Sequence, residues 1–107
     1  MKYWVFLVVA IVLETIGTTS LKQAATTSNH LFTLIFALAF VGSFTLFWNA
    51  LKGIDLSIAY AIWAGAGVVF ISLLGIIVFK EEITFPKLIF IGFILVGVVG
   101  LKLNSKI

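Results

Sequence analysis

Residues 56–79 read LSIAYAIWAGAGVVFISLLGIIVF, a run without a single charged side chain. At a rise of about 1.5 Å per residue, a helix of this length can cross the roughly 30 Å hydrocarbon core of a bilayer. The run is too long for a strand of a membrane barrel, and it lacks the alternation of polar and apolar residues that such strands show. It is therefore predicted to form a transmembrane helix.

Three further segments are apolar enough and long enough to span a bilayer: residues 3–21, 31–51 and 83–103. The first carries one charge, Glu14, and the last carries Lys87 and Lys102 near its ends, where lysine side chains can reach the interface. Short polar connections separate the four segments. The sequence thus predicts an all-α integral membrane protein, with four transmembrane helices in one domain over residues 1–107.

The composition also indicates that the bilayer is the solvent, because 63% of the residues are hydrophobic and only 10% are charged. A water-soluble domain of this size would need many more charged residues on its surface. The lysines are scattered and form no basic stripe, so nucleic-acid binding is not expected. Without cysteine, and with a single histidine, no metal site is expected. The absence of a nucleophile–base pair and of a phosphate loop argues against an enzyme, and no cofactor is expected.

The lysines give little indication of orientation. Short connections make neighbouring helices antiparallel, so both termini are expected on one side of the membrane. Four lysines fall on the side of the termini, namely Lys2, Lys52, Lys102 and Lys106. Three fall on the other side, namely Lys22, Lys80 and Lys87. Because the positive-inside rule needs a clear excess, insertion in both orientations is the hypothesis, and a single orientation with both termini inside stays open.

Glu14 is the one acidic residue within the apolar segments. A charged side chain at the middle of a bilayer costs about 3 kcal/mol on insertion scales, so it persists only where it has a partner or a function. On a helix, Ala10, Gly17 and Thr18 share a face with it. A carboxylate in such surroundings can exchange a proton for another cation, and we expect Glu14 to bind both in turn. The alternative is a structural carboxyl group that is hydrogen-bonded to a neighbour.

Two aromatic residues of the third segment, Tyr60 and Trp63, lie one turn apart and therefore on one face of the helix. Aromatic rings beside a carboxylate attract organic cations through cation–π interactions. The hydroxyl group of Tyr60 could also hydrogen-bond Glu14. Trp63 lies about 10 Å from the start of the helix, which is deep for a residue that anchors the membrane interface. Ordinary packing is the alternative for both residues.

Small residues mark further positions of interest. Gly65 and Gly67 lie in mid-span, where two glycines permit a bend, although close helix packing explains the same residues equally well. Gly97 belongs to a glycine-rich surface of the last segment, which is typical of contacts between membrane helices and indicates a dimer. The hydroxyl group of Ser43 could bond either Glu14 or the backbone of its own helix.

The segment ETIGTTSLK, residues 14–22, and the segment AYAIWAGAG, residues 59–67, resemble the first- and third-helix motifs of the small multidrug resistance transporters. With this chain length and number of spans, the likeness covers nearly the whole chain. It implies a dimer of two antiparallel four-helix chains that works by alternating access. It also implies that Glu14 of both subunits binds either protons or a cationic substrate, which Tyr60 and Trp63 would border.

The resemblance implies roles for other residues. Ser43 would support the carboxylate, and Gly65 and Gly67 match the bend of the third helix. Gly97 matches a glycine of the dimer contact, although Phe90 stands where that contact usually has a second glycine. The remaining supporting residues of the site are expected to be Ala10, Thr18 and Phe44.

Three features bear on the type of transporter within this family. Guanidinium exporters typically have tryptophan where this chain has Gly17, which favours the multidrug type. Residues 52–61, KGIDLSIAYA, are similar to the polyamine-exporting type, whose members work as pairs of different chains. Phe40 stands where many multidrug members have tyrosine, which could alter the range of substrates.

The function expected from the sequence is efflux of cationic, often aromatic or quaternary ammonium compounds in exchange for protons. The expected location is the inner membrane of a bacterium or archaeon, with membrane lipid and a second identical or related subunit as partners. Two alternatives stay open. One is export of polyamines or other small cationic metabolites by half of a heterodimer, and the other is a non-transporting structural or regulatory membrane subunit.

Overall fold

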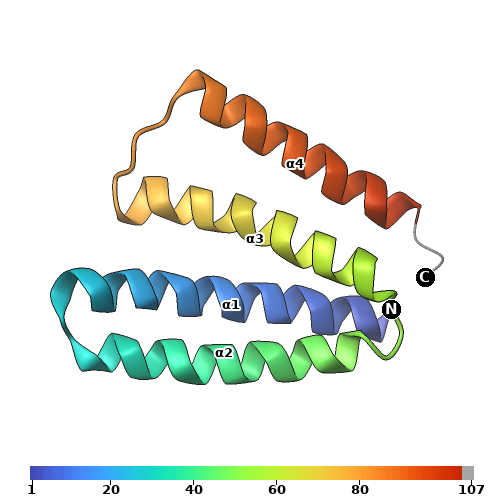
Figure 1. Ribbon diagram of the computed structural model, residues 1–107, viewed down its shortest axis with the longest axis horizontal. Coiled ribbons are helices and arrows are strands. Elements are labelled where there is room, and N and C mark those ends of the chain that lie inside the picture. Colours follow the sequence, from blue (N-terminus) through green and yellow to red (C-terminus); the bar gives the residue numbers. More distant parts are fainter. Residues whose placement is uncertain (105–107) are drawn as a thin grey trace.

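The computed structural model describes residues 1–104. Lys106, which counts among the lysines expected on the side of the termini, lies outside the described residues. The described chain folds into four helices, α1 (Lys2–Thr27), α2 (His30–Ala50), α3 (Leu56–Val78) and α4 (Phe85–Leu103) (Figure 1). All four are long and apolar enough to cross a membrane. The prediction of an all-α protein with four spans is therefore confirmed.

The helices lie side by side in the order α2, α1, α3, α4, and each is antiparallel to the next one along the chain (Figure 1). The molecule measures 44 × 35 × 17 Å, so it is a flat layer rather than a closed four-helix bundle. The layer has a small core, in which side chains of α1 and α2 meet the first half of α3, around Leu7, Ala10, Phe47, Ala59 and Ile62. Helix α4 has no buried residue and packs mainly against α3, although the Nζ atom of Lys102 also lies 4.3 Å from the ring centroid of Trp4 in α1. A single chain thus leaves broad apolar faces uncovered.

Helix α1 is longer than predicted, because it continues past Leu21 to Thr27. Most residues after Leu21 have good helix propensity. The backbone N–H of Ser28 donates to the carbonyl of Ala24 at 2.9 Å, which closes the last turn. Ser28 then adopts a left-handed conformation, with φ of 57°, and ends the helix. The predicted connection of residues 22–30 is therefore mostly helical.

Helix α4 begins two residues later than predicted, at Phe85 rather than Ile83. The cause is the N-cap, because the side-chain oxygen of Thr84 accepts from the backbone N–H of Lys87 at 3.2 Å. Pro86 occupies the first turn, where its missing N–H costs nothing.

Ser43 connects α1 and α2 directly. Its side chain is fully buried, and its hydroxyl group donates to the carbonyl of Ala10 at 2.6 Å. The sequence left open a bond to Glu14 or to the backbone of its own helix, and Ser43 makes neither, because it faces the backbone of α1 one turn before the carboxylate. The role of Ser43 in this geometry is to hold the two helices together.

Replacing Ser43 with alanine should lower the free energy of unfolding by about 1 kcal/mol, since a buried carbonyl loses a partner on the neighbouring helix. Unfolding by denaturant in detergent micelles would measure the change. Thr45→Ala is the matched control, because the exposed hydroxyl group of Thr45 bonds only within its own helix, to Val41 at 2.8 Å. Equal losses in the two variants would contradict the interhelical role of Ser43.

Candidate functional site

Glu14 lies half-buried on the side of α1 that faces α3. Its Oε1 accepts a hydrogen bond from the hydroxyl group of Thr18 at 2.8 Å, one turn later on the same helix. Its Oε2 lies 3.4 Å from the position that a Cβ atom would occupy at Gly67 of α3. Thr18 thus orients the carboxylate, and Gly67 leaves the space beside it clear of a side chain.

A cavity of about 310 Å³ lies between α1 and α3 next to this carboxylate. Its lining includes Glu14 from α1 and five residues of α3, Tyr60, Trp63, Gly67, Val68 and Ser72. Glu14 contributes the only ionisable carboxylate of the lining, and the rest is mainly apolar or aromatic. Binding sites for small molecules commonly combine an apolar wall with a few convergent polar groups. The structure therefore brings together the three residues that were predicted to bind protons and substrate.

Trp63 is held in place by aromatic neighbours. It packs against Phe47 with ring centroids 4.7 Å apart, and Phe44 meets it edge-on at 5.5 Å. Tyr60 adds a second edge-on contact at 5.7 Å. Phe44 therefore supports the site indirectly, by packing against Trp63, and is not part of the cavity lining. Such contacts give the ring a fixed orientation beside the carboxylate.

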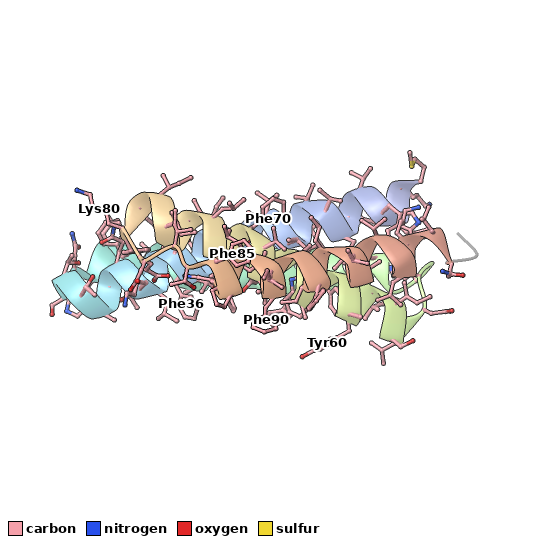
Figure 2. All side chains as sticks on the ribbon, turned by 90° about the horizontal axis from the view of Figure 1, so that it is seen from above. Phe36, Tyr60, Phe70, Lys80, Phe85 and Phe90 are labelled. Carbon is pink, nitrogen blue, oxygen red and sulfur yellow. The ribbon has the colours of Figure 1, made fainter. Side chains whose placement is uncertain are left out.

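Tyr60 is 57% exposed and projects from α3 on the same side of the molecule as Phe36 and Phe90 (Figure 2). Its hydroxyl group makes no hydrogen bond within residues 1–104, so the bond to Glu14 that the sequence left possible is not made in this structure. The ring thus borders the cavity while its hydroxyl group points to the surroundings.

The charges of the described residues leave Glu14 without a cationic neighbour. Between residues 1 and 104 the one ion pair joins Lys87 and Glu81, with the Nζ and Oε1 atoms 3.8 Å apart. Nor does this part of the chain hold any group of three histidine, cysteine or acidic residues that could bind a metal ion. The carboxylate is therefore free to bind a proton or an organic cation.

The glycines of α3 serve close packing. A Cβ atom at Gly65 would collide with Val98 of α4, and α3 runs through Gly65 and Gly67 as one continuous helix. The bend expected at these two positions stays a prediction. Gly97 of α4 faces open space, because within residues 1–104 no atom outside its own stretch of helix backbone lies within 4 Å of the position of an added Cβ.

Ser72 is a polar lining residue that the sequence reading did not select. One side of α3 carries a row of lining residues that are three or four positions apart, namely Tyr60, Trp63, Gly67 and Ile71. Ser72 follows Ile71 directly. Ser72 lies four residues after Val68 and eight after Ala64, which also line the cavity, so four-residue spacing along this neighbouring row would have identified the hydroxyl group.

Comparison with known proteins adds independent information. The model of the family described as "Small Multidrug Resistance protein" matches residues 2–94. The chain is 40% identical over 104 residues to the "Uncharacterized membrane protein YvaE" of Bacillus subtilis, a match that covers 97% of this chain and 87% of the relative. The family match thus includes every residue of the cavity described above.

Two other relatives have names that state a substrate. The chain is 35% identical over 102 residues to the "Guanidinium exporter" of Yersinia pseudotuberculosis, covering 95% of this chain and 98% of the relative. It is 32% identical over 106 residues to the "Multidrug transporter PA4990" of Pseudomonas aeruginosa, covering 99% and 96%. Because the two sequence identities are so similar, they do not indicate which of the two substrates this chain exports.

Proposed function

The chain belongs to the small multidrug resistance family and is a multi-pass membrane protein that exports small cations, and we propose that it exchanges protons for organic cations, often aromatic or quaternary ammonium compounds. Membership of a family of transporters excludes an enzyme and favours transport over the structural or regulatory role considered from the sequence.

The observation that carries the proposal is the carboxylate of Glu14 in an apolar, aromatic cavity with no cationic neighbour among the described residues. A carboxylate within a membrane span is stable when it holds a proton or a positive ligand. The aromatic ring of Trp63, in the same cavity, adds cation–π attraction for the ligand. An anion would be repelled by the carboxylate, and a neutral compound would lack both the charge attraction to Glu14 and the cation–π attraction to Trp63.

The proposed exchange follows from competition. A protonated Glu14 has no charge with which to hold an organic cation, and a Glu14 that holds the cation cannot take up a proton. Binding of one ligand therefore expels the other. If the protein changes the side to which the cavity opens only when it is loaded, protons moving inward drive the cation outward.

We propose that the working unit is an antiparallel dimer of this chain or of this chain and a related one. The flat shape of the single chain supports this, because a layer 17 Å thick cannot enclose a passage. Helix α4 has no buried residue, and no other helix of the described chain comes within 4 Å of the Cβ position at Gly97. Small residues let membrane helices approach closely, so α4 is suited to a contact between subunits.

The packing around Gly17 favours aromatic and quaternary ammonium cations over guanidinium. Gly17 is buried, and a Cβ atom there would lie 2.5 Å from the ring of Phe40. Tryptophan, which the guanidinium exporters typically have at this position, would displace that ring. The aromatic contacts between Phe40 and Phe44, and between Phe44 and Trp63, would then be lost.

Transport by the purified protein in lipid vesicles tests the proposal. Vesicles with an acidic interior should accumulate labelled tetraphenylphosphonium against its gradient, since protons that leave drive the cation in. The same vesicles treated with a proton–potassium exchanger should not accumulate it. Uptake that is indifferent to the pH gradient would refute the exchange. Guanidinium as the preferred substrate would instead refute the assignment to aromatic and quaternary cations.

A further inference from the structure

A second cavity, of about 180 Å³, continues the first one toward the connection between α3 and α4. Ile71 lines both cavities, which therefore adjoin. On the α1 side the lining passes from Glu14 to Thr18 and Lys22, at four-residue intervals on one face of the helix. The two cavities form a groove between α1 and α3, with Glu14 in its middle part and Glu81 at its end.

The carboxylate of Glu81 is seated on α3 in a specific way. Lys80 has a left-handed backbone, with φ of 55°, which turns the chain back along the helix. The backbone N–H of Glu81 then donates to the carbonyl of Gly75 at 3.0 Å. Its carboxyl carbon lies 2.8 Å from the position that a Cβ atom would have at Gly75, so any larger residue there would push the carboxylate away.

Glu81 and Glu14 are placed against α3 in the same way. Each carboxylate lies against a glycine of α3, Glu14 at Gly67 and Glu81 at Gly75. These glycines are eight residues apart, which corresponds to about 12 Å along a helix. Two carboxylates therefore line one groove with a spacing similar to the length of an extended diamine or bis-quaternary chain.

We infer that Glu81 is a second cation-binding residue, which holds the far positive charge of a linear organic dication while Glu14 holds the near one. The inference rests on the function proposed above. It specifies elongated dications as one class of the organic cations that the protein would export. The alkyl chain between the two charges would lie along Ile71 and the aromatic ring of Phe79, both of which line the groove.

The side chains of Lys87 and Lys22 lie close to Glu81, and their positive charges oppose the binding of a cation there. Lys87 pairs with it at 3.8 Å, but both side chains are partly exposed, 32% and 46%, and such pairs contribute little to stability. A ligand ammonium group can therefore replace Lys87. Lys22 lines the same cavity with its ammonium group 6.0 Å from the ring centroid of Phe79. Without Glu81, the lysines would make this end of the groove repel cations.

Binding of bis(trimethylammonium)alkanes, from butane to dodecane, to the purified protein tests the inference. Each is compared with the alkyltrimethylammonium monocation of the same chain length, which has one charge but a similar apolar part. The ratio of the two affinities should peak at the chain that spans about 12 Å. At that length Glu81→Gln should weaken the dication about fivefold, the value of one modest charge interaction, and should leave the monocation within about twofold.

Glu82→Gln is the matched control, because Glu82 adjoins Glu81 but lines neither cavity, so it should change neither affinity. Equal weakening of dication and monocation by Glu81→Gln, or no preferred chain length, would overturn the inference alone. Failure of the unsubstituted protein to bind any of the monocations would overturn the proposed function, and this inference with it.

Discussion

Glu14→Gln should abolish proton-driven export while leaving the four helices inserted. Glutamine has nearly the same shape, and its carbonyl can still accept the hydrogen bond from Thr18 that orients the present carboxylate at 2.8 Å. It can neither release a proton nor offer a negative charge. No other acidic residue lines the cavity beside Trp63, and Glu81 lies farther along the groove, so no second carboxylate can take the place of Glu14 there.

The expected loss is large. Removing one partner of a buried, charge-assisted contact typically costs 2–5 kcal/mol or more, so the affinity for an organic cation should fall by about two orders of magnitude. Accumulation in vesicles with an acidic interior should fall to the level of protein-free vesicles. Glu14→Asp is the matched control, because it keeps a carboxylate on a shorter arm and should retain pH-dependent binding with lower affinity. Undiminished transport by Glu14→Gln would contradict the proposed exchange.

Trp63→Ala should weaken the binding of aromatic cations much more than that of small aliphatic ones. The ring of Trp63 lines the cavity beside Glu14 and is fixed by Phe44 and Phe47. An aromatic cation can both stack on it and interact with its π face, whereas a small aliphatic ammonium group makes mainly the second contact. The two contributions together predict about a tenfold loss for tetraphenylphosphonium and about a threefold loss for tetramethylammonium.

Equilibrium binding of both cations to the same detergent-solubilised preparation would measure this difference. Trp63→Phe controls for packing, because a smaller ring still fills most of the space between Phe44 and Phe47 and should preserve part of the preference. Unfolding by denaturant would show whether each variant keeps its fold. Equal losses for both cations in Trp63→Ala would show that the residue only packs against its aromatic neighbours.

The four spans could be predicted because they depend only on composition. Each is an apolar run of sufficient length, and the bilayer imposes the helix on it whatever its neighbours are. The helix ends were less predictable, because they depend on local hydrogen bonds. The left-handed Ser28 sets the end of α1, and the side chain of Thr84 delays the start of α4, through local geometry that hydropathy does not register.

The central part of the site could also be found in the sequence. Glu14 is conspicuous as a charge within an apolar span, and Tyr60 and Trp63 share a face by helical spacing alone. What the sequence could not give is which helix each residue meets. Ser43 could reach either Glu14 or its own backbone, and only the packing of α1 against α2 directs it to Ala10.

The second carboxylate of the groove illustrates the same limit. From the sequence, Glu81 belongs to an ordinary charged connection between two spans. Its position depends on the left-handed turn at Lys80 and on the space above Gly75, which are properties of the folded chain. Glycine at position 75 allowed for such a contact but did not identify the residue that makes it.

The proposed competition at Glu14 can be tested by measuring the affinity of the purified protein for tetraphenylphosphonium between about pH 5 and pH 9. We expect the affinity to rise with pH, because deprotonation frees the carboxylate for the cation, and to level off once deprotonation is complete. Binding in unbuffered solution should also release protons, and Glu14→Gln should show neither effect. An affinity that is constant over this range, or a pH dependence that persists in Glu14→Gln, would contradict the mechanism.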